Sequence, residues 1–311
     1  MIHKIGLETK NLHGSFSNEY NPILTVESGD SIHLKTLDIQ WGYSGAENEE
    51  RTIFESREKE PKPGHPLIGP IAVKGAKPGM VLEVRTNELI PGWYGRNWAG
   101  GKPSWQNEKL GIIDEERVQL DWKLNPTLMT GTCAIGNREF RVGLSPFLGL
   151  MGVAPAEPGI HSTTPPRYSG GNIDCKELVR GSSLFLPVSV EGALFSLGDA
   201  HALQGDGESS GTAIECPMDL VDITLILHRD KTLKLPRANT PAGWITFGFD
   251  EDLNEAAGTA LNEMVQLMQE FYGISKTEAT ALSSAAVDLR ITQVVNGVKG
   301  AHAILPHGVL R

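Results

Sequence analysis

Residues 198–208 bring two aspartates, a glutamate, a histidine and a glutamine, side chains capable of acid–base or metal chemistry, into eleven positions of this sequence. The run reads Gly-Asp-Ala-His-Ala-Leu-Gln-Gly-Asp-Gly-Glu and directly follows an apolar segment. In an extended chain, side chains two positions apart share a face, so Asp199 and His201 are predicted to point the same way. The same spacing relates Asp206 to Glu208.

Clustered carboxylates require compensation. Two like charges about 4 Å apart repel by about 4 kcal/mol at an effective dielectric constant of about 20. A bound divalent cation or a shared proton removes that repulsion. Carboxylates with an imidazole suit zinc or another first-row metal, whereas an oxygen-only subset suits calcium. The alternative interpretation is an acidic, solvated loop whose charges lie far apart, and spacing alone leaves both open.

Two other segments carry candidate site residues. Asp38 follows a predicted strand, and residues at strand ends can converge on one rim of a β-structure, which makes Asp38 a possible third ligand. Asn172 and Asp174 share a face if their segment is extended, and such a pair supplies the donor and acceptor that an amide needs. Each of these residues also fits an ordinary turn.

Other catalytic signatures are missing from the sequence. It contains no H-E-x-x-H motif, P-loop or dinucleotide fingerprint. Cys133, Cys175 and Cys216 are too scattered for a disulfide framework, and we interpret them as buried or incidental rather than nucleophilic.

The elements that must position these residues are mainly strands. Short apolar runs with period-two alternation and glycine punctuation fill residues 1–235, which predicts a β-rich, sandwich- or barrel-like region carrying most of the site. Residues 236–311 are predicted to form an α+β region. Apolar residues at helical spacing run from 253 to 271, after a possible capping box at Asp252 and before Gly273, which stands where a C-terminal cap would, and a second box at Ser275 starts another helix. A strand over 289–295 and an Asn-Gly turn follow.

Composition and charge restrict the partners. The formal charge of −10, with no Lys/Arg cluster, disfavours nucleic acid as a partner. The sequence contains neither an apolar stretch of membrane-spanning length nor the apolar core of a signal peptide at its start. The expectation is therefore a cytoplasmic protein that binds neither nucleic acid nor membrane.

In its motifs the chain resembles the acetamidase/formamidase family. The matching phrases are Asn-Pro at 21–22, Val-Glu-Ser-Gly-Asp at 26–30, Gly-His-Pro-Leu-Ile-Gly-Pro at 64–70 and Gly-Asn-Ile-Asp at 171–174. The strongest is the run 198–208, closed by Glu215, and residues 289–295 match a late motif. The resemblance extends over nearly the whole chain in the expected order. It implies a β-rich fold, hydrolysis of formamide- or acetamide-like compounds to a carboxylate and ammonia, and a homo-oligomer, either a dimer or larger.

Within that resemblance, we hypothesise metal-assisted amide hydrolysis. Asp38, Asp199 and His201 would hold a divalent metal, with zinc favoured and calcium the alternative. Glu208 would act as general base, and Asp206 would orient Glu208 or raise its pKa. The planar amide of the small substrate would be held by three further residues: Asn172, Asp174 and Gln204.

Two other functions stay open at this point. The same site could hydrolyse cyclic amides or lactones. A calcium-binding β-sandwich module that recognises a ligand without turnover is the second alternative.

Overall fold

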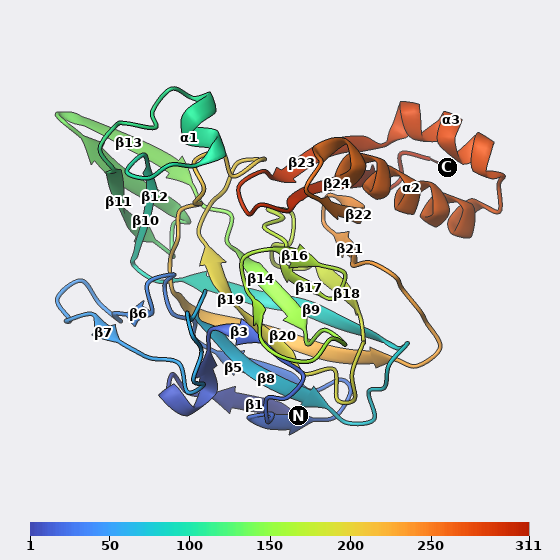
Figure 1. The fold of residues 1–311 in the computed structure, drawn as a ribbon, viewed down its shortest axis with the longest axis horizontal. Coiled ribbons are helices and arrows are strands. Elements are labelled where there is room, and N and C mark those ends of the chain that lie inside the picture. Colours follow the sequence, from blue (N-terminus) through green and yellow to red (C-terminus); the bar gives the residue numbers. More distant parts are fainter. Residues whose placement is uncertain (311) are drawn as a thin grey trace.

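The computed structural model describes residues 1–310 and is mainly β, with its longer helices near the C-terminus (Figure 1). Its largest sheet has nine strands within these residues. In spatial order they are β1 (Ile2–Ile5), β5 (Ser31–Leu34), β20 (Met218–His228), β9 (Val81–Pro91), β18 (Ser183–Pro187), β21 (Arg237–Thr240), β22 (Gly243–Asp250), β24 (Lys299–Pro306) and β23 (Asp288–Gln293).

A second sheet carries most of the candidate site. In the described chain its path runs through β16 (Pro166–Arg167), β17 (Gly170–Asn172), β14 (Phe147–Val153), β19 (Phe195–His201), β8 (Leu67–Val73) and β2 (Leu12–His13), with β4 (Leu24–Val26) also paired to β8. Strands β8, β14 and β19 are buried along their whole length. Such continuous burial explains why β8 and β14 read as unbroken apolar runs rather than alternating ones, whereas β19 also buries the polar site residues Asp199 and His201.

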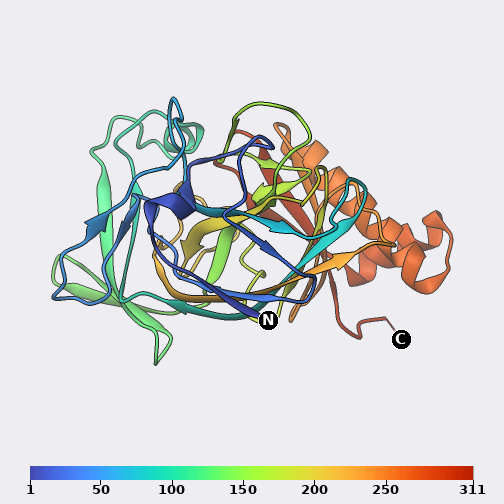
Figure 2. The same cartoon turned by 90° about the horizontal axis from the view of Figure 1, so that it is seen from below.

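One hydrophobic core joins the two large sheets. It includes Leu82 of β9 and Ile223 of β20 from the first sheet, and Ile71, Leu148 and Phe195 from the second. The two sheets therefore pack face to face as a sandwich, and the sheets are open rather than closed into barrels (Figure 2). The predicted mainly β fold is confirmed, and its sandwich form replaces the barrel alternative.

A four-stranded arm projects from the sandwich (Figure 1). It consists of β10 (Tyr94–Ala99), β11 (Val118–Asn125), β12 (Thr130–Ile135) and β13 (Arg138–Gly143). The short helix α1 (Trp105–Lys109) lies in the connection between β10 and β11. The remaining short elements are η1 (Thr9–Asn11), the pair β3 (Ser15–Phe16) and β15 (His161–Ser162), and the pair β6 (Gly42–Tyr43) and β7 (Thr52–Ile53).

Two helices cover the C-terminal end of the large sheet (Figure 2). Helix α2 (Leu253–Tyr272) packs against β22 and β24 through Ala256, Ala260 and Met264, and α3 (Lys276–Ala286) packs beside it. The predicted stop at Gly273 is confirmed, because this residue adopts the left-handed conformation with φ of 63°. The predicted capping box at Ser275 is confirmed too, whereas Asp252 caps α2 by accepting a hydrogen bond from the Asn254 amide.

Strands β21 to β24 extend the sheet that β18 belongs to, so hydrogen bonding is continuous across residue 235. The division into regions 1–235 and 236–311 stays a prediction. Among the described residues, the helices fall short of the length and apolarity that a membrane crossing needs.

Candidate active site

The neighbouring strands β14 and β19 form the floor of the candidate site. They pair antiparallel, with Leu148 opposite Ala200 and Leu150 opposite Gly198. Gly149 therefore lies opposite Asp199, and His201 follows two positions later on the same face of β19. The predicted proximity of Asp199 and His201 is confirmed, since Asp199 Oδ2 lies 3.5 Å from His201 Nε2.

Two loops bring three further acids to this floor, one acid from the loop after β17 and two from the connection between β19 and β20. Asp174 follows β17, and its amide donates to the Gly149 carbonyl at 3.1 Å. Glu208 lies in the loop after β19. Glu215 returns beside His201 as an isolated antiparallel bridge. The side chains form two groups of potential metal ligands, and His201 belongs to both. Asp174 and Glu208 complete the first group, and Asp199 and Glu215 complete the second.

The imidazole of His201 is held on all sides. Its Nδ1 lies 2.9 Å from Gln204 Oε1, and its Nε2 lies 3.3 Å from Glu215 Oε2. The ring meets Phe147 edge-on, with centroids 5.0 Å apart. Because an amide oxygen only accepts, Nδ1 must carry a proton, which leaves Nε2 to face the carboxylates.

Burial and mutual repulsion shift the protonation of the acids. Burial, followed by the charge of Asp199, raises the pKa of Asp174 to about 8. Burial and the Asp174 charge raise the pKa of Glu208 well above its usual range. Burial also raises the pKa of Glu215, although His201 opposes that rise. Several acids at this site are thus pushed toward the neutral form when no cation is bound.

Asp199 and His201 shift the other way, toward their charged forms. Burial alone would raise the pKa of Asp199, but the charges of His65 and His201 lower it below its usual value. Burial alone would lower the pKa of His201, but Glu215 and Asp199 raise it well above 6.5. Without a metal, the imidazolium therefore supplies the positive charge that the carboxylates require.

The site also contains buried polar atoms that lack partners. Within residues 1–310, no hydrogen bond reaches Asp174 Oδ1, Asp199 Oδ1, His201 Nε2 or Glu215 Oε2. Buried polar atoms are normally satisfied, so a group of them facing one another indicates a ligand position. Nitrogen and carboxylate oxygen donors at these separations fit a divalent ion such as zinc, whose ligand atoms lie about 3.3 Å apart in a tetrahedron of about 2.0 Å bonds.

Glycine at position 149 keeps this space open. A Cβ there would lie 2.6 Å from Asp174 Oδ1, 2.8 Å from His201 Cε1 and 2.9 Å from Asp199 Oδ2. Any larger residue would thus enter the space where these three side chains converge.

Three acids of the site share an unusual backbone conformation. Asp174, Asp199 and Glu208 have φ values of 55°, 52° and 47°, in the left-handed region that non-glycine residues rarely adopt. Such conformations cost on the order of 1–3 kcal/mol each and persist where the surroundings enforce them. Their coincidence at one cluster supports a functional role for these carboxylates.

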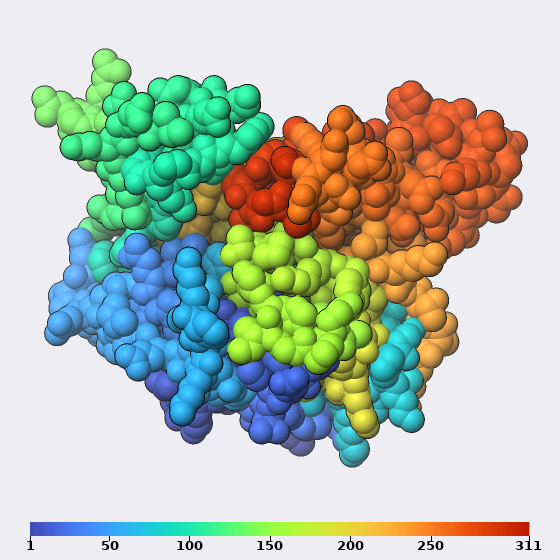
Figure 3. All heavy atoms as spheres, viewed as in Figure 1, coloured from blue at the N-terminus to red at the C-terminus, as the bar shows by residue number. Residues whose placement is uncertain are grey.

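A pocket of about 370 Å³ leads toward the site. Its lining includes His65, whose charge acts on Asp199, and Asn296, whose Nδ2 donates to Asp174 Oδ2 at 2.8 Å. Trp98 and Lys102 line it from β10 and the connection to α1. On the face in Figure 3, the red spheres of the chain near residue 295 lie between this connection and the yellow-green segment that precedes β17.

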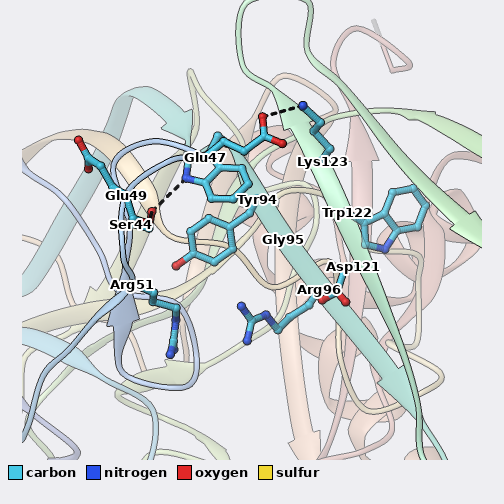
Figure 4. Close-up of a pocket in the computed structure, with 11 residues that line it drawn as sticks. Ser44, Glu47, Glu49, Arg51, Tyr94, Gly95, Arg96, Asp121, Trp122 and Lys123 are labelled. Carbon is cyan, nitrogen blue, oxygen red and sulfur yellow. Dashed lines mark hydrogen bonds and ion pairs between the residues drawn. The ribbon is translucent and has the colours of Figure 1, made fainter.

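The structure does not bring Asp38 into the cluster, which corrects its predicted role as a ligand. Asp38 follows β5 in the nine-stranded sheet, whereas Asp199 belongs to the other sheet. Both its oxygens already accept hydrogen bonds from Arg51, at 2.6 and 2.7 Å, and Tyr94 donates to Oδ2 at 2.8 Å. Arg51 and Tyr94 line a different pocket, of about 440 Å³, together with Arg96 (Figure 4).

Asp206 also lies apart from its predicted position beside Glu208. Its side chain is about one-third exposed and faces Lys176 at 3.0 Å and Arg290 at 3.8 Å. After burial itself, the carboxylates that raise the pKa of Glu208 are those of Asp174, Glu215 and Asp199. Alternation of side chains predicted a shared face, but a left-handed residue at Glu208 breaks the extended conformation on which that prediction depends.

The three predicted substrate ligands separate in the structure. Asp174 lies among the carboxylates, and Gln204 is engaged twice, with His201 and with the Asp174 carbonyl, to which its Nε2 donates at 2.8 Å. Asn172 is buried and donates to the Thr164 carbonyl at 3.1 Å, while its Oδ1 has no partner in the described chain.

Sequence reasoning missed three contributors: Glu215, Gly149 and Asn296. Glu215 closes the strongest stretch that matches the family, and this match is the signal that could have identified it from the sequence. Gly149 lies in an apolar strand with no polar signal, and Asn296 reads as an ordinary Asn-Gly turn residue.

Comparison with known proteins decides the family. The pattern of the Acetamidase/Formamidase family matches residues 3–162 and 156–310. The chain belongs to this family. A formamidase from Methylophilus methylotrophus is 52% identical over 264 residues, covering 67% of this chain and 63% of that protein. This family member and the other curated relatives are longer, and the chain spans less than two thirds of their length.

Solved structures of family members share the fold. A predicted acetamidase/formamidase from Thermoanaerobacter tengcongensis has a TM-score of 0.83 and 28% identity, covering 100% of this chain and 98% of that one. An acetamidase from Bacillus halodurans has a TM-score of 0.81 and 26% identity, covering 97% of both chains. The expected resemblance to this family is confirmed.

Proposed function

We propose that this protein hydrolyses small linear amides to a carboxylate and ammonia. One observation carries the proposal: four buried carboxylates converge on His201, and several of their oxygens, with His201 Nε2, are unpartnered within the described chain. The names of the relatives, a formamidase and an acetamidase among them, supply the substrate class.

A divalent cation fits this cluster, and Asp199, His201 and Glu215 would hold it. The separations of 3.3 and 3.5 Å from His201 Nε2 to the two carboxylates suit zinc, which we favour over calcium because an imidazole is among the donors. His201 would bind as the neutral imidazole, and its Nδ1–H would donate to Gln204 Oε1. When bound, the ion would polarise the amide carbonyl and acidify water.

Proton transfer would be carried out by Glu208 and Asp174, which complete the other group of potential ligand atoms around His201. Both carboxyls are buried and have raised pKa values, so each accepts a proton more readily than an ordinary carboxylate. Glu208 would take the proton of the attacking water and return it to the leaving nitrogen. Asp174, fixed by Asn296, would lie beside Glu208 and, in its ionised form, raise the pKa of that base.

The test measures ammonia release from formamide, acetamide and longer linear amides, and, in parallel, the amino acid that forms when a γ-lactam ring is opened, because lactam hydrolysis releases no ammonia. Glu208→Gln and Asp199→Asn should each lower the rate at least 100-fold, and only Asp199→Asn should lose bound metal. Asp38→Asn is the control, expected to lower thermal stability while retaining metal. Full activity in both site variants would refute the proposed site.

The same assay separates the alternatives. Turnover of the lactam but not of linear amides would favour a cyclic substrate. Calcium as the bound metal, with no ammonia from any amide, would favour the binding module.

A homo-oligomer is a further proposal. It is supported by exposed apolar side chains on the arm, where Leu128, Ile135 and Phe140 are 70%, 49% and 45% exposed. Light scattering after size-exclusion chromatography tests it, and a monomer at micromolar concentration would contradict it. The cytoplasmic location stays a prediction.

A further inference from the structure

A second buried cluster, formed by Cys175, Glu177 and His302, lies outside the carboxylate site. Cys175 and His302 are fully buried, and Glu177 is 8% exposed. Cys175 Sγ lies 3.3 Å from Glu177 Oε2, and His302 Nε2 lies 3.4 Å from the same oxygen. One ligand atom from each residue therefore lies within 4.8 Å of the others.

His302 points an unsatisfied nitrogen into this cluster. Its Nδ1 is 2.7 Å from Thr292 Oγ1, which fixes the orientation of the ring. Its Nε2 has no hydrogen-bond partner among residues 1–310, although the side chain is only 1% exposed. A buried ring nitrogen that lacks a hydrogen-bond partner and faces a thiol and a carboxylate has the surroundings of a metal ligand.

The neighbouring charges leave the other donors available. Arg290 Nη1 lies 3.0 Å from Glu177 Oε1, so it occupies the carboxylate oxygen that faces away from the cluster. Lys176 lies 3.0 Å from Asp206, and Arg290 lies 3.8 Å from it, so two cations share the charge of Asp206, and Arg290 also pairs with Glu177. Glu177 Oε2, which accepts from the Cys175 thiol, and the thiolate left when that proton departs would face an added cation.

We propose that Cys175, Glu177 and His302 form a zinc site distinct from the carboxylate site, with water as the fourth ligand. Sulfur, nitrogen and carboxylate oxygen are the donors that zinc takes in proteins. The separations of 3.3 and 3.4 Å match the edges of a tetrahedron with zinc bonds of about 2.0–2.3 Å. On binding, the Cys175 thiol releases its proton to solvent and binds as thiolate.

The position of this site indicates a structural role. Cys175 and Glu177 lie in the loop that follows β17 and begins with Asp174, whereas His302 lies in β24. An ion there would tie the loop of the seven-stranded sheet to the C-terminal hairpin of the nine-stranded sheet. The same hairpin carries Asn296, so the link would hold Asn296 against Asp174.

Cobalt substitution provides the decisive test, because only a thiolate ligand gives an intense near-ultraviolet charge-transfer band. Metal-stripped full-length protein is titrated with Co²⁺ alone. The band should appear in the parent protein and in Cys133→Ser and Cys216→Ser, and it should vanish in Cys175→Ser. Absence of the band in the parent, or its dependence on Cys216 instead of Cys175, would overturn the proposal.

Zinc stoichiometry gives a second measurement that does not depend on the cysteine variant folding well. His302→Gln, which keeps a polar side chain, should bind one zinc fewer per chain than the parent. Asp199→Asn should keep the cobalt thiolate band, since its defect lies at the other site. Equal zinc content in His302→Gln and the parent would contradict the proposal.

Discussion

Gln204 lies between His201 and the Asp174 backbone, with its Oε1 2.9 Å from His201 Nδ1 and its Nε2 donating to the Asp174 carbonyl at 2.8 Å. This one side chain therefore fixes the tautomer of the imidazole and the position of the loop that carries Asp174. Outer partners of this kind commonly determine how well a ligand histidine works.

Gln204→Leu should lower kcat by about 10- to 100-fold, because the Nδ1 proton loses its acceptor and the ring can adopt the other tautomer. Metal affinity should fall with it. The measurement is ammonia release together with zinc titration. Gln266→Leu, on the exposed face of α2, is the control and should match the parent. An unchanged kcat in Gln204→Leu would show that Gln204 does not position the imidazole for catalysis.

Gly149→Ala should abolish activity with limited loss of stability. The added methyl group would lie within 3 Å of atoms of Asp174, Asp199 and His201, and displacing them costs about 1–3 kcal/mol. Gly143→Ala is the matched control, since a Cβ there has no heavy atom within 4 Å among the described residues. Rates and thermal midpoints of both variants test this, and an active Gly149→Ala protein would contradict the geometry of the site.

Asn296→Ala should lower kcat by about tenfold, because Asp174 Oδ2 loses the donor that holds it at 2.8 Å. The expected change is in kcat rather than KM if Asp174 acts on the chemical step. Asn262→Ala, whose side chain accepts from Lys276, serves as the control. Parent-like kinetics in Asn296→Ala would show that the C-terminal hairpin does not assist catalysis.

His13 should make stability depend on pH between about 4 and 6.5. Burial lowers the pKa of His13 to about 4, although a hydrogen bond to the Ser15 carbonyl opposes that change. The unfolded chain therefore binds this proton more readily. Stability is complete above pH 6.5 and falls as the pH drops toward 4, by up to about 3 kcal/mol.

Urea unfolding of the parent and His13→Gln at several pH values measures this contribution as a difference between the two proteins. The variant should lose less stability than the parent over this range. Ser196→Ala, which removes the partner 3.0 Å from His13 Nε2, should retain a pH-dependent loss. Identical slopes for parent and His13→Gln would rule the prediction out.

The sequence by itself determined the class of fold, the family and the segment to which we assign the chemistry. Periodicity identified the strands and both C-terminal helices, because local spacing decides which face of an element is apolar. It also identified Gly273 and Ser275 as helix boundaries, since capping depends on neighbouring residues alone. Asp199, His201 and Glu208 were found for the same reason, as they lie within ten positions of one another.

Only the tertiary structure decided which acids meet. Asp174 and Glu215 reach His201 because strand pairing and left-handed turns place them there, and these are non-local properties. Asp38 appeared equivalent to them in the sequence, yet it follows a strand of the other sheet and is neutralised by Arg51. Asp206, only two residues from Glu208, faces Lys176 instead. The position of a carboxylate in the sequence does not identify the residue with which it pairs, because that pairing depends on how distant strands pack.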